Sequence, residues 1–273
     1  FGTVEKTRSL PGQPMSTFRV IQFNMQFGRT WRETDPDHAP IALEQTIAEI
    51  RKRDADIVLL QEVEQARPGG AQSDPPSNYT RLRTELPHYD GFFRYPKADP
   101  RELPFGVGLA ILSRTPLRGP RHWDLPSPPI EFEFQGETRT PTDRLLIGAA
   151  TSIGGLELFV FNTHLLAFFM LDSSSELHAA QRQLVLQQIV KAQGPTLIGG
   201  DFNVRNHESL VQQFSRAGFS AIQTQEHTWR RRPYVLDHIF YNSKLRPVGH
   251  AVHPTPASDH HVLMAEFEFT ASR

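Results

Sequence analysis

Two short apolar runs near the start of the chain decide the fold class: "FRVIQFN" at residues 18–24 and "ADIVLLQE" at residues 55–62. The first is rich in aromatic and β-branched residues, the second in leucine and β-branched residues, and both have the length of buried strands. Between them Leu43, Ile47 and Ile50 recur at helical spacing, followed by the charged "RKRD" that closes the helix. The order strand, helix, strand indicates an α/β fold.

The same pattern of apolar runs separated by turn residues continues along the chain. Further strands are predicted at "VGLAILSR" (107–114), "RLLIGAATSI" (144–153), "LELFVFNTH" (156–164), "PTLIGGDFN" (195–203), "YVLDHIFYN" (234–242) and "VLMAEFEF" (262–269). Gly154 and Gly155 predict a hairpin between two of them. Ser173 and Glu176 fit a capping box for a following helix, and "ESLVQQFSRAG" (208–218) predicts another helix.

Length and composition are those of one large globular domain. The chain has 273 residues, of which 38% are hydrophobic and 22% charged, so an ample core is expected. Residues 1–16, with Pro11, Gly12 and Pro14, are predicted to be a linker or extension, and residues 17–273 the domain. Because the chain opens with Phe1, we expect an N-terminal segment to have been lost. No pattern indicates a compartment.

Charge and cysteine content limit the chemistry. The net charge is −1, so any contact with a polyanion must come from a local basic patch. The absence of cysteine excludes disulfides and thiolate metal sites and leaves oxygen and histidine ligands.

Polar side chains recur where predicted strands begin or end. Taken singly, each is better explained as a helix cap, a turn residue or a buried histidine. Together, carboxylates and amides from several strand ends suit Mg²⁺ or Mn²⁺, and neighbouring histidines can move protons near neutral pH. The set comprises Asn24, Glu62, Asn162, His164, Asp201, Asn203, Asp237, Asp259 and His260.

One stretch near the C-terminus, "ASDHHVL" at residues 257–263, places an acid before two histidines. If a strand begins here, Asp259 and His261 share one face and His260 points to the other. The spacing alone leaves open which histidine takes part in chemistry.

Seven blocks in order resemble the endonuclease/exonuclease/phosphatase family of metal-dependent phosphohydrolases. They are "IQFNMQ", "LLQEV", "VGLAILSR", "FNTHL", "GGDFN", "LDHIF" and "SDHHVL", and they span most of the chain. The resemblance implies a four-layer α/β sandwich, with two mainly antiparallel sheets packed face to face and helices outside. It also implies a metal-dependent phosphoric ester hydrolase, of the nuclease or phosphodiesterase kind, that uses Mg²⁺ or Mn²⁺.

The resemblance also assigns roles position by position. Asn24, Glu62 and Asp259 are similar to the family's metal-site residues. The residues that resemble its catalytic group are His164, Asp201, Asn203, Asp237 and His260, with Asp237 orienting His260. His261 and His238 are expected to be structural. One departure is that "PFGVGLAILSR" lacks the Glu or Tyr that supports the centre of the site in several branches, and Glu102 lies slightly upstream.

Two segments bear on the substrate. Arg230, Arg231 and Arg232 in "TWRRRP" are predicted to bind phosphate at the rim of the site, which favours nucleic acid or another soluble phosphodiester. The apolar "LLAFFML" (165–171) is expected to continue a strand into the core. As a loop it would instead favour a phospholipid phosphodiesterase of the sphingomyelinase type, with a membrane lipid as partner. A third alternative is a catalytically dead binding module. We expect a monomer without an obligate protein partner.

Overall fold

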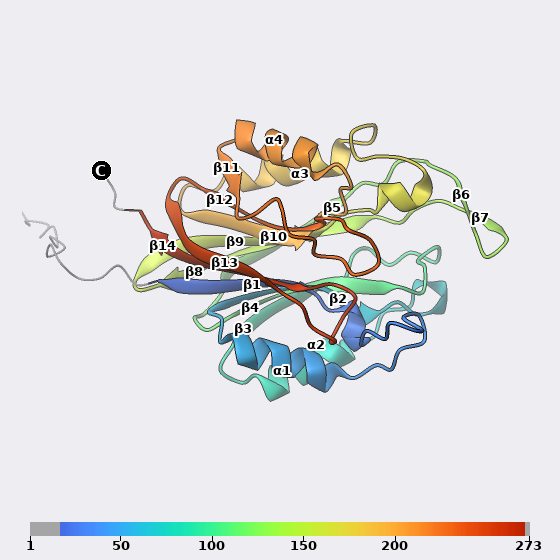
Figure 1. Cartoon of the computed structure of the whole chain (residues 1–273), viewed down its shortest axis with the longest axis horizontal. Helices are drawn as coiled ribbons and strands as arrows, with labels where there is room; N and C mark the ends of the chain where they lie inside the picture. Colours follow the sequence, from blue (N-terminus) through green and yellow to red (C-terminus); the bar gives the residue numbers. More distant parts are fainter. Residues whose placement is uncertain (1–16, 271–273) are drawn as a thin grey trace, which may run out of the picture.

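The computed structural model describes residues 17–270, so the predicted linker at residues 1–16 lies outside the described part. Within residues 17–270 two six-stranded sheets lie face to face (Figure 1). The first has the order β13-β14-β1-β2-β4-β3. Its strands are β1 (Phe18–Asn24), β2 (Ile57–Gln65), β3 (Asp90–Arg94), β4 (Gly106–Ser113), β13 (Leu245–His253) and β14 (Val262–Phe269).

The second sheet has the order β11-β12-β10-β9-β8-β5. Its strands are β5 (Arg118–Leu125), β8 (Arg144–Ile153), β9 (Leu156–His164), β10 (Thr196–Asp201), β11 (Phe219–Ala221) and β12 (Asp237–Asn242). Each sheet has one parallel pair, β1 with β2 and β9 with β10, while its other neighbours are antiparallel. A separate hairpin of β6 (Phe132–Phe134) and β7 (Glu137–Arg139) extends from the body of the molecule (Figure 1).

Helices cover the outer face of each sheet (Figure 1). The first sheet carries α1 (Leu43–Arg53) and α2 (Ser77–Glu85), and the second carries α3 (Ala180–Ile189) and α4 (His207–Arg216). Short 3₁₀ turns are η1 (Gln26–Gly28), η2 (Pro68–Gly70) and η3 (Phe168–Leu171). The predicted four-layer α/β sandwich is therefore confirmed.

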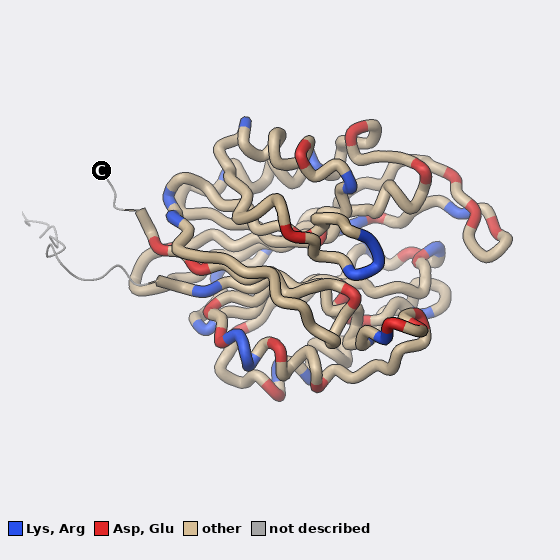
Figure 2. The backbone as a smooth tube through the Cα atoms, in the orientation of Figure 1, with Lys and Arg blue, Asp and Glu red and all other residues tan. Residues whose placement is uncertain are grey.

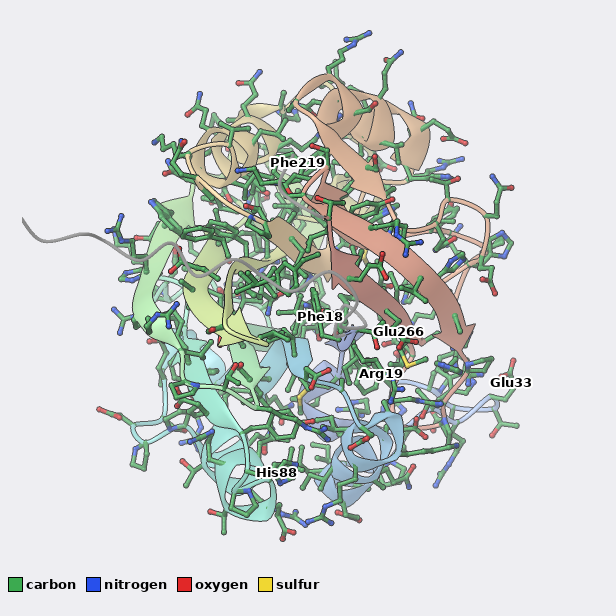
Figure 3. All side chains as sticks on the ribbon, turned by 90° about the vertical axis from the view of Figure 1, so that its left-hand side faces the viewer. Phe18, Arg19, Glu33, His88, Phe219 and Glu266 are labelled. Carbon is green, nitrogen blue, oxygen red and sulfur yellow. The ribbon has the colours of Figure 1, made fainter. Side chains whose placement is uncertain are left out.

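Apolar residues fill all three gaps between the four layers. Alternate residues of β1 serve two gaps, because successive side chains of a strand point to opposite faces. Phe18 and Val20 pack between the sheets, and Figure 3 shows Phe18 there. Ile21 and Phe23 pack toward α1 and α2. A third cluster, which includes Phe219, lies under α3 and α4.

Three local expectations differ from the structure. Residues 165–171 do not continue β9, which ends at His164; they form a loop that contains η3. The capping box at Ser173 does not start a helix, since α3 begins at Ala180 without a side-chain cap. Four strands of the two sheets, β3, β5, β11 and β13, were not among the predicted strands. Among residues 17–270, no helix combines the length and the hydropathy that crossing a membrane requires.

Candidate active site

The predicted site residues meet at one end of the two sheets. Asn24 is the last residue of β1, His164 of β9 and Asp201 of β10. Asp201 is paired with His164 on one side and with Asp237, the first residue of β12, on the other. The segment Ser258–His260 precedes β14, which runs antiparallel to β1. Parallel strands that end together and antiparallel strands that begin there bring these side chains to one edge.

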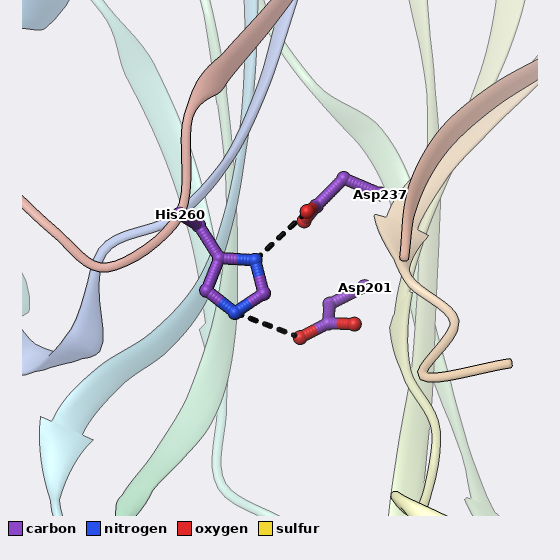
Figure 4. A group of neighbouring side chains, drawn as sticks. All are labelled: Asp201, Asp237 and His260. Carbon is purple, nitrogen blue, oxygen red and sulfur yellow. Dashed lines mark hydrogen bonds and ion pairs between the residues drawn. The ribbon is translucent and has the colours of Figure 1, made fainter. Parts of the chain in front are cut away.

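His260 stands between two aspartates (Figure 4). Its Nδ1 lies 2.8 Å from Asp237 Oδ2, and its Nε2 lies 3.6 Å from Asp201 Oδ2. Burial lowers the pKa of His260, but Asp237 and Asp201 outweigh that effect and raise it to about 10. His260 is therefore an imidazolium that donates from Nδ1 to Asp237 and presents Nε2–H toward Asp201.

Asn24 joins the two carboxylates Glu62 and Asp201. Its Nδ2 donates to Glu62 Oε1 and to Asp201 Oδ2, at 3.0 Å each. Glu62 reaches this position from a bulge in β2, where its φ is +50°. Gly106 on β4 allows the bulge, because a Cβ there would lie only 2.2 Å from Glu62 Cβ.

Burial raises the pKa of both carboxyl groups. It raises that of Glu62 against the opposing effect of the Asn24 hydrogen bond, and it raises that of Asp201 to about 8. Negative charge on one carboxylate also disfavours the ionised form of its neighbours. Asp259 raises the pKa of Glu62, and Asp237 and Glu62 raise the pKa of Asp201. Clustered buried acids of this kind gain stability from a cation.

His164 and Asn203 form the other wall of the site. Asn203 Nδ2 lies 3.0 Å from both His164 Nε2 and the Leu165 carbonyl oxygen, while its backbone N–H donates to Asp201 Oδ1. The φ of Asn203 is +50°, a conformation that asparagine tolerates in such turns. Burial, with Arg144 and His260 nearby, holds the pKa of His164 well below 6.5. His164 is therefore neutral, and its Nε2 accepts from Asn203.

The residues fit a divalent cation that prefers oxygen ligands. Asp201, Asp237 and His260 each place a possible ligand atom within 4.8 Å of the others. Asp237 and His260, however, are already paired with each other. The better donor set is Glu62 and Asp201 with Asn24, because the half-buried Glu62 and the buried Asp201 carboxylates converge on the Asn24 amide and both are acids that a cation would stabilise.

Asp259 is engaged by the arginine segment. Its Oδ2 accepts from Arg231 Nε at 2.8 Å and from Trp229 Nε1 at 3.3 Å. Arg231 also pairs with Asp37 at 2.8 Å, and Arg230 donates to the Thr255 carbonyl oxygen at 2.7 Å. Figure 2 shows these arginines as the continuous blue stretch of one loop. Arg232 is exposed. The loop borders the site, but two of its arginines are held by the protein.

The apolar segment 165–171 is mostly packed rather than exposed. Leu165, Leu166 and Phe168 are buried, while Met170 is 62% exposed. Phe169 contacts the rings of Trp229 and Tyr234 edge-on, so it belongs to the wall that also carries the arginine loop. A cavity of about 490 Å³ opens beside this wall. It is lined by residues of η3, of the loop that follows it and of the turn after β10: Phe168, Phe169, Asp172, Ser173, Ser174, Ser175, Glu176, Asn203, Val204, Arg205 and Asn206.

The two histidines expected to be structural do not join the cluster. His238 is buried, its Nε2 donates to the Val235 carbonyl oxygen at 3.1 Å, and burial lowers its pKa to about 4. His261 is half-buried and its backbone N–H donates to the Thr228 carbonyl oxygen at 2.8 Å.

Sequence reasoning missed two residues near the site. Arg144, the first residue of β8, lowers the pKa of both His164 and Glu62 and lies 3.7 Å from Glu102 Oε1. Glu102 pairs with Arg144 and accepts a hydrogen bond from Thr142 Oγ1 at 2.8 Å. Gln22, in the middle of β1, donates to Asp237 Oδ1 at 2.9 Å. A polar residue inside the run "FRVIQFN" was the signal available for Gln22.

Comparison with known proteins gives one family. Residues 21–260 match the Endonuclease/Exonuclease/phosphatase family. A UPF0294 protein of Yersinia pseudotuberculosis is 30% identical over 138 residues, 48% of this chain and 52% of that protein. The matched region thus spans about half the length of that curated relative.

Solved structures share the fold over nearly the whole chain. An endonuclease/exonuclease/phosphatase family protein from Bacteroides thetaiotaomicron has a TM-score of 0.69 and 16% identity, covering 95% of this chain and 100% of its own. The human Nocturnin catalytic domain with bound sulfate anion has a TM-score of 0.68 and 21% identity, covering 93% and 95%. At such identities the likeness concerns the fold alone.

Proposed function

The chain belongs to the endonuclease/exonuclease/phosphatase family, and on that premise we propose that it is a Mg²⁺- or Mn²⁺-dependent hydrolase of phosphodiester bonds. Its substrate is nucleic acid or another soluble phosphodiester. The observation that carries this proposal is the buried group of Asp201, Asp237 and His260, whose ligand atoms lie within 4.8 Å of one another, with Glu62, Asn24, His164 and Asn203 around Asp201.

Glu62 and Asp201, with Asn24, are the residues that would hold the metal. When bound, it supplies a positive charge that neutralises charge developing on the phosphate oxygens. Asp259 is proposed to complete this shell from the neighbouring loop, where Arg231 now contacts it.

The chain's own residues supply positioning and proton transfer. Asp237 fixes the ring of His260, which carries a proton on Nε2 and can donate it to a phosphate oxygen. Asp201, in its ionised form, is placed beside His260 and Asn24 to accept the proton of the attacking water. The Asn203 amide hydrogen that now faces His164 can turn toward a non-bridging oxygen.

The packing of segment 165–171 favours a soluble substrate over a lipid. Its three most buried members belong to the interior of the protein, which leaves little apolar surface from this segment to enter a membrane. The retained acids, amides and histidines also favour an enzyme over a binding module. Monomeric action without a protein partner remains part of the proposal.

The test is hydrolysis of bis(p-nitrophenyl) phosphate with Mg²⁺, with Mn²⁺ and after treatment with EDTA. We expect turnover with metal and none with chelator. Glu62→Gln should lower the rate and be partly rescued at high metal concentration, because it weakens a carboxylate ligand. Glu64→Gln is the matched control, since this buried acid on the same strand binds Tyr79 and Ser77 instead.

Two results would contradict the proposal. Turnover that persists in EDTA would remove the metal requirement. A folded protein that hydrolyses no phosphodiester with either metal would favour the binding-module alternative.

A further inference from the structure

We propose that Gln22 is a positioning residue for catalysis: it holds Asp237, and through Asp237 the ring of His260, at the end of a buried chain of amides that crosses between the two sheets. This inference rests on the proposed function and names a residue that its site requires. Gln22 lies on β1, two residues before Asn24, and its side chain is fully buried.

The amide chain runs without interruption from the site to the first sheet's backbone. Gln22 Nε2 donates to Asp237 Oδ1 at 2.9 Å and to Gln61 Oε1 at 2.6 Å. Gln61 Nε2 donates to Asn162 Oδ1 at 2.7 Å. Asn162 Nδ2 then donates to the carbonyl oxygens of Leu60 and Ala110, at 2.9 Å each.

The fold makes room for this crossing. Gly199 on β10 lies opposite Gln22, and a Cβ added there would meet Gln22 Cγ at 3.3 Å and Leu59 Cδ1 at 2.5 Å. Any larger residue at 199 would therefore push against the side chain that reaches Asp237. Asp201, two residues further along the same strand, is part of the site.

The chain has a fixed polarity. Gln22 uses its amide nitrogen for two acceptors, one of them a carboxylate oxygen. Turning the amide over would place its carbonyl oxygen against that carboxylate and against the Gln61 oxygen, which is repulsive. The observed orientation leaves Gln22 Oε1 buried with no donor among residues 17–270. An unsatisfied buried acceptor costs stability, and an apolar side chain would avoid that cost.

What this arrangement provides is a fixed carboxylate. Asp237 Oδ2 accepts from His260 Nδ1 and Oδ1 accepts from Gln22, while the Asp237 backbone N–H donates to Thr228 Oγ1 at 3.0 Å. With both oxygens engaged, the carboxylate cannot rotate away from the imidazole. The ring of His260 is thereby held with Nε2 directed at Asp201.

The experiment compares Gln22→Met, Gln22→Glu and Thr151→Val. Methionine has about the length of glutamine but donates no hydrogen bond, and glutamate has its size but cannot donate to both acceptors. Thr151 is the matched control: it is fully buried and makes a polar contact across the sheets with Ser113, at 3.2 Å, away from the site.

Three measurements are made on the full chain. They are kcat and KM for bis(p-nitrophenyl) phosphate with Mg²⁺, the free energy of unfolding in urea, and the proton NMR signal of His260 Nδ1–H, assigned by its loss in His260→Ala. We expect both Gln22 variants to lower kcat by about tenfold or more, with little change in KM, and to shift or broaden the NMR signal. Thr151→Val should lower stability and leave kcat and the NMR signal unchanged.

The inference is overturned if a folded Gln22→Met or Gln22→Glu keeps the wild-type kcat and NMR signal. It is also overturned if Thr151→Val lowers kcat as much as they do, since Gln22 would then be one structural residue among others. If the wild-type protein hydrolyses no phosphodiester, the proposed function fails, but the NMR signal still decides whether Gln22 fixes the Asp237–His260 pair.

Discussion

His260 illustrates how one residue depends on its two neighbours. Its Nδ1 contacts Asp237 and its Nε2 faces Asp201, and both aspartates favour the protonated ring. For His261, next in the chain, burial and Arg230 outweigh the opposing effect of Asp237 and lower the pKa to about 4. The two histidines that the sequence could not separate by spacing thus have opposite electrostatic environments.

We therefore expect His260→Ala and His261→Ala to differ in kind. His260→Ala should lower the rate on the order of 10²-fold or more, the scale of a lost proton-transfer group, while the protein stays folded. His261→Ala should change the free energy of unfolding more than the rate. Kinetics and urea unfolding of both variants check this, and an inactive but well-folded His261→Ala beside an active His260→Ala would show that the roles are reversed.

The lowered pKa of His238 leads us to expect that the folded protein loses stability in acid. Its pKa is lowered from 6.5 to about 4 because the ring is buried, with His207 adding a smaller effect in the same direction. A histidine that binds its proton more weakly in the folded state stabilises the fold above pH 6.5, and this contribution is lost as the pH falls toward 4. The full effect of such a shift is roughly 3 kcal/mol.

His238→Phe should reduce that acid sensitivity. The ring still packs against Phe240 and Phe202, but it cannot take up a proton, and the bond to Val235 is lost. At pH 7.5 we expect a loss of about 1 kcal/mol from the missing hydrogen bond. Between pH 6.5 and 4.5 the unfolding free energy should fall less steeply than in the wild type, and an unchanged slope in urea titrations would contradict the assignment.

At the scale of elements, strands that end in a polar residue were predictable and their surroundings were not. Apolar runs and the turn residues between them located β1, β2, β9, β10, β12 and β14, and with them the backbone positions of Asn24, His164 and Asp201. Segment 165–171 is apolar enough for a strand, but Asn203 Nδ2 donates a hydrogen bond to the Leu165 carbonyl oxygen and the chain turns there. That contact is 38 residues distant, beyond any local pattern.

The roles of Arg144 and Gln22 were also beyond the reach of local sequence patterns. Each lies in a run that has the pattern of an ordinary strand, and each has its partner far away in the sequence: Glu102, in the loop before β4, for Arg144 and Asp237, on β12, for Gln22. The resemblance to a family supplied the site because its blocks already encode such distant contacts. Arg144 lies outside those blocks, and Gln22 lies inside one of them, but only the structure shows its contact with Asp237.

The arginine loop can be divided by the same reasoning. Arg231 is tied to Asp259 and Asp37, and Arg230 to the Thr255 carbonyl oxygen, whereas Arg232 is exposed. If nucleic acid is the substrate, Arg232→Ala should raise KM and reduce the slope of log binding against log salt by about one unit. Its unfolding free energy should not change.

Arg231→Ala should behave differently. It leaves the buried Asp259 carboxylate with one fewer donor and frees the 29–42 loop at Asp37, so we expect lower stability as well as weaker substrate binding. Salt-dependent binding of a short DNA and urea unfolding of both variants separate the two. Equal effects of Arg231→Ala and Arg232→Ala on stability would contradict the division.

Across the whole molecule, the two sheets bring residues from nearly the full length of the chain to one edge. The net charge is only −1, so no general field attracts a polyanion, and substrate choice depends on the rim of this edge. The rim carries the arginine loop on one wall and segment 165–171 with its following loop beside it. Met170 and Leu177 are the strongly exposed apolar residues of that second region, at 62% and 77%.

The last prediction asks which wall selects the substrate. A soluble substrate predicts that the wild-type protein cleaves single- or double-stranded DNA or a small phosphodiester and does not sediment with phospholipid vesicles. A lipid substrate predicts vesicle binding that Met170→Ser with Leu177→Ser abolishes while hydrolysis of a soluble phosphodiester is spared, because membrane affinity grows with the apolar area buried. Ile41→Ser with Val190→Ser is the matched control, since these apolar residues are about half exposed in other segments, before α1 and after α3. We expect cleavage without sedimentation, because Leu165, Leu166 and Phe168 are buried in the interior and only Met170 and Leu177 are strongly exposed apolar residues in this described region. Vesicle binding that depends on Met170 and Leu177 but not on the control pair, with no cleavage of nucleic acid, would reverse the order of the two substrates.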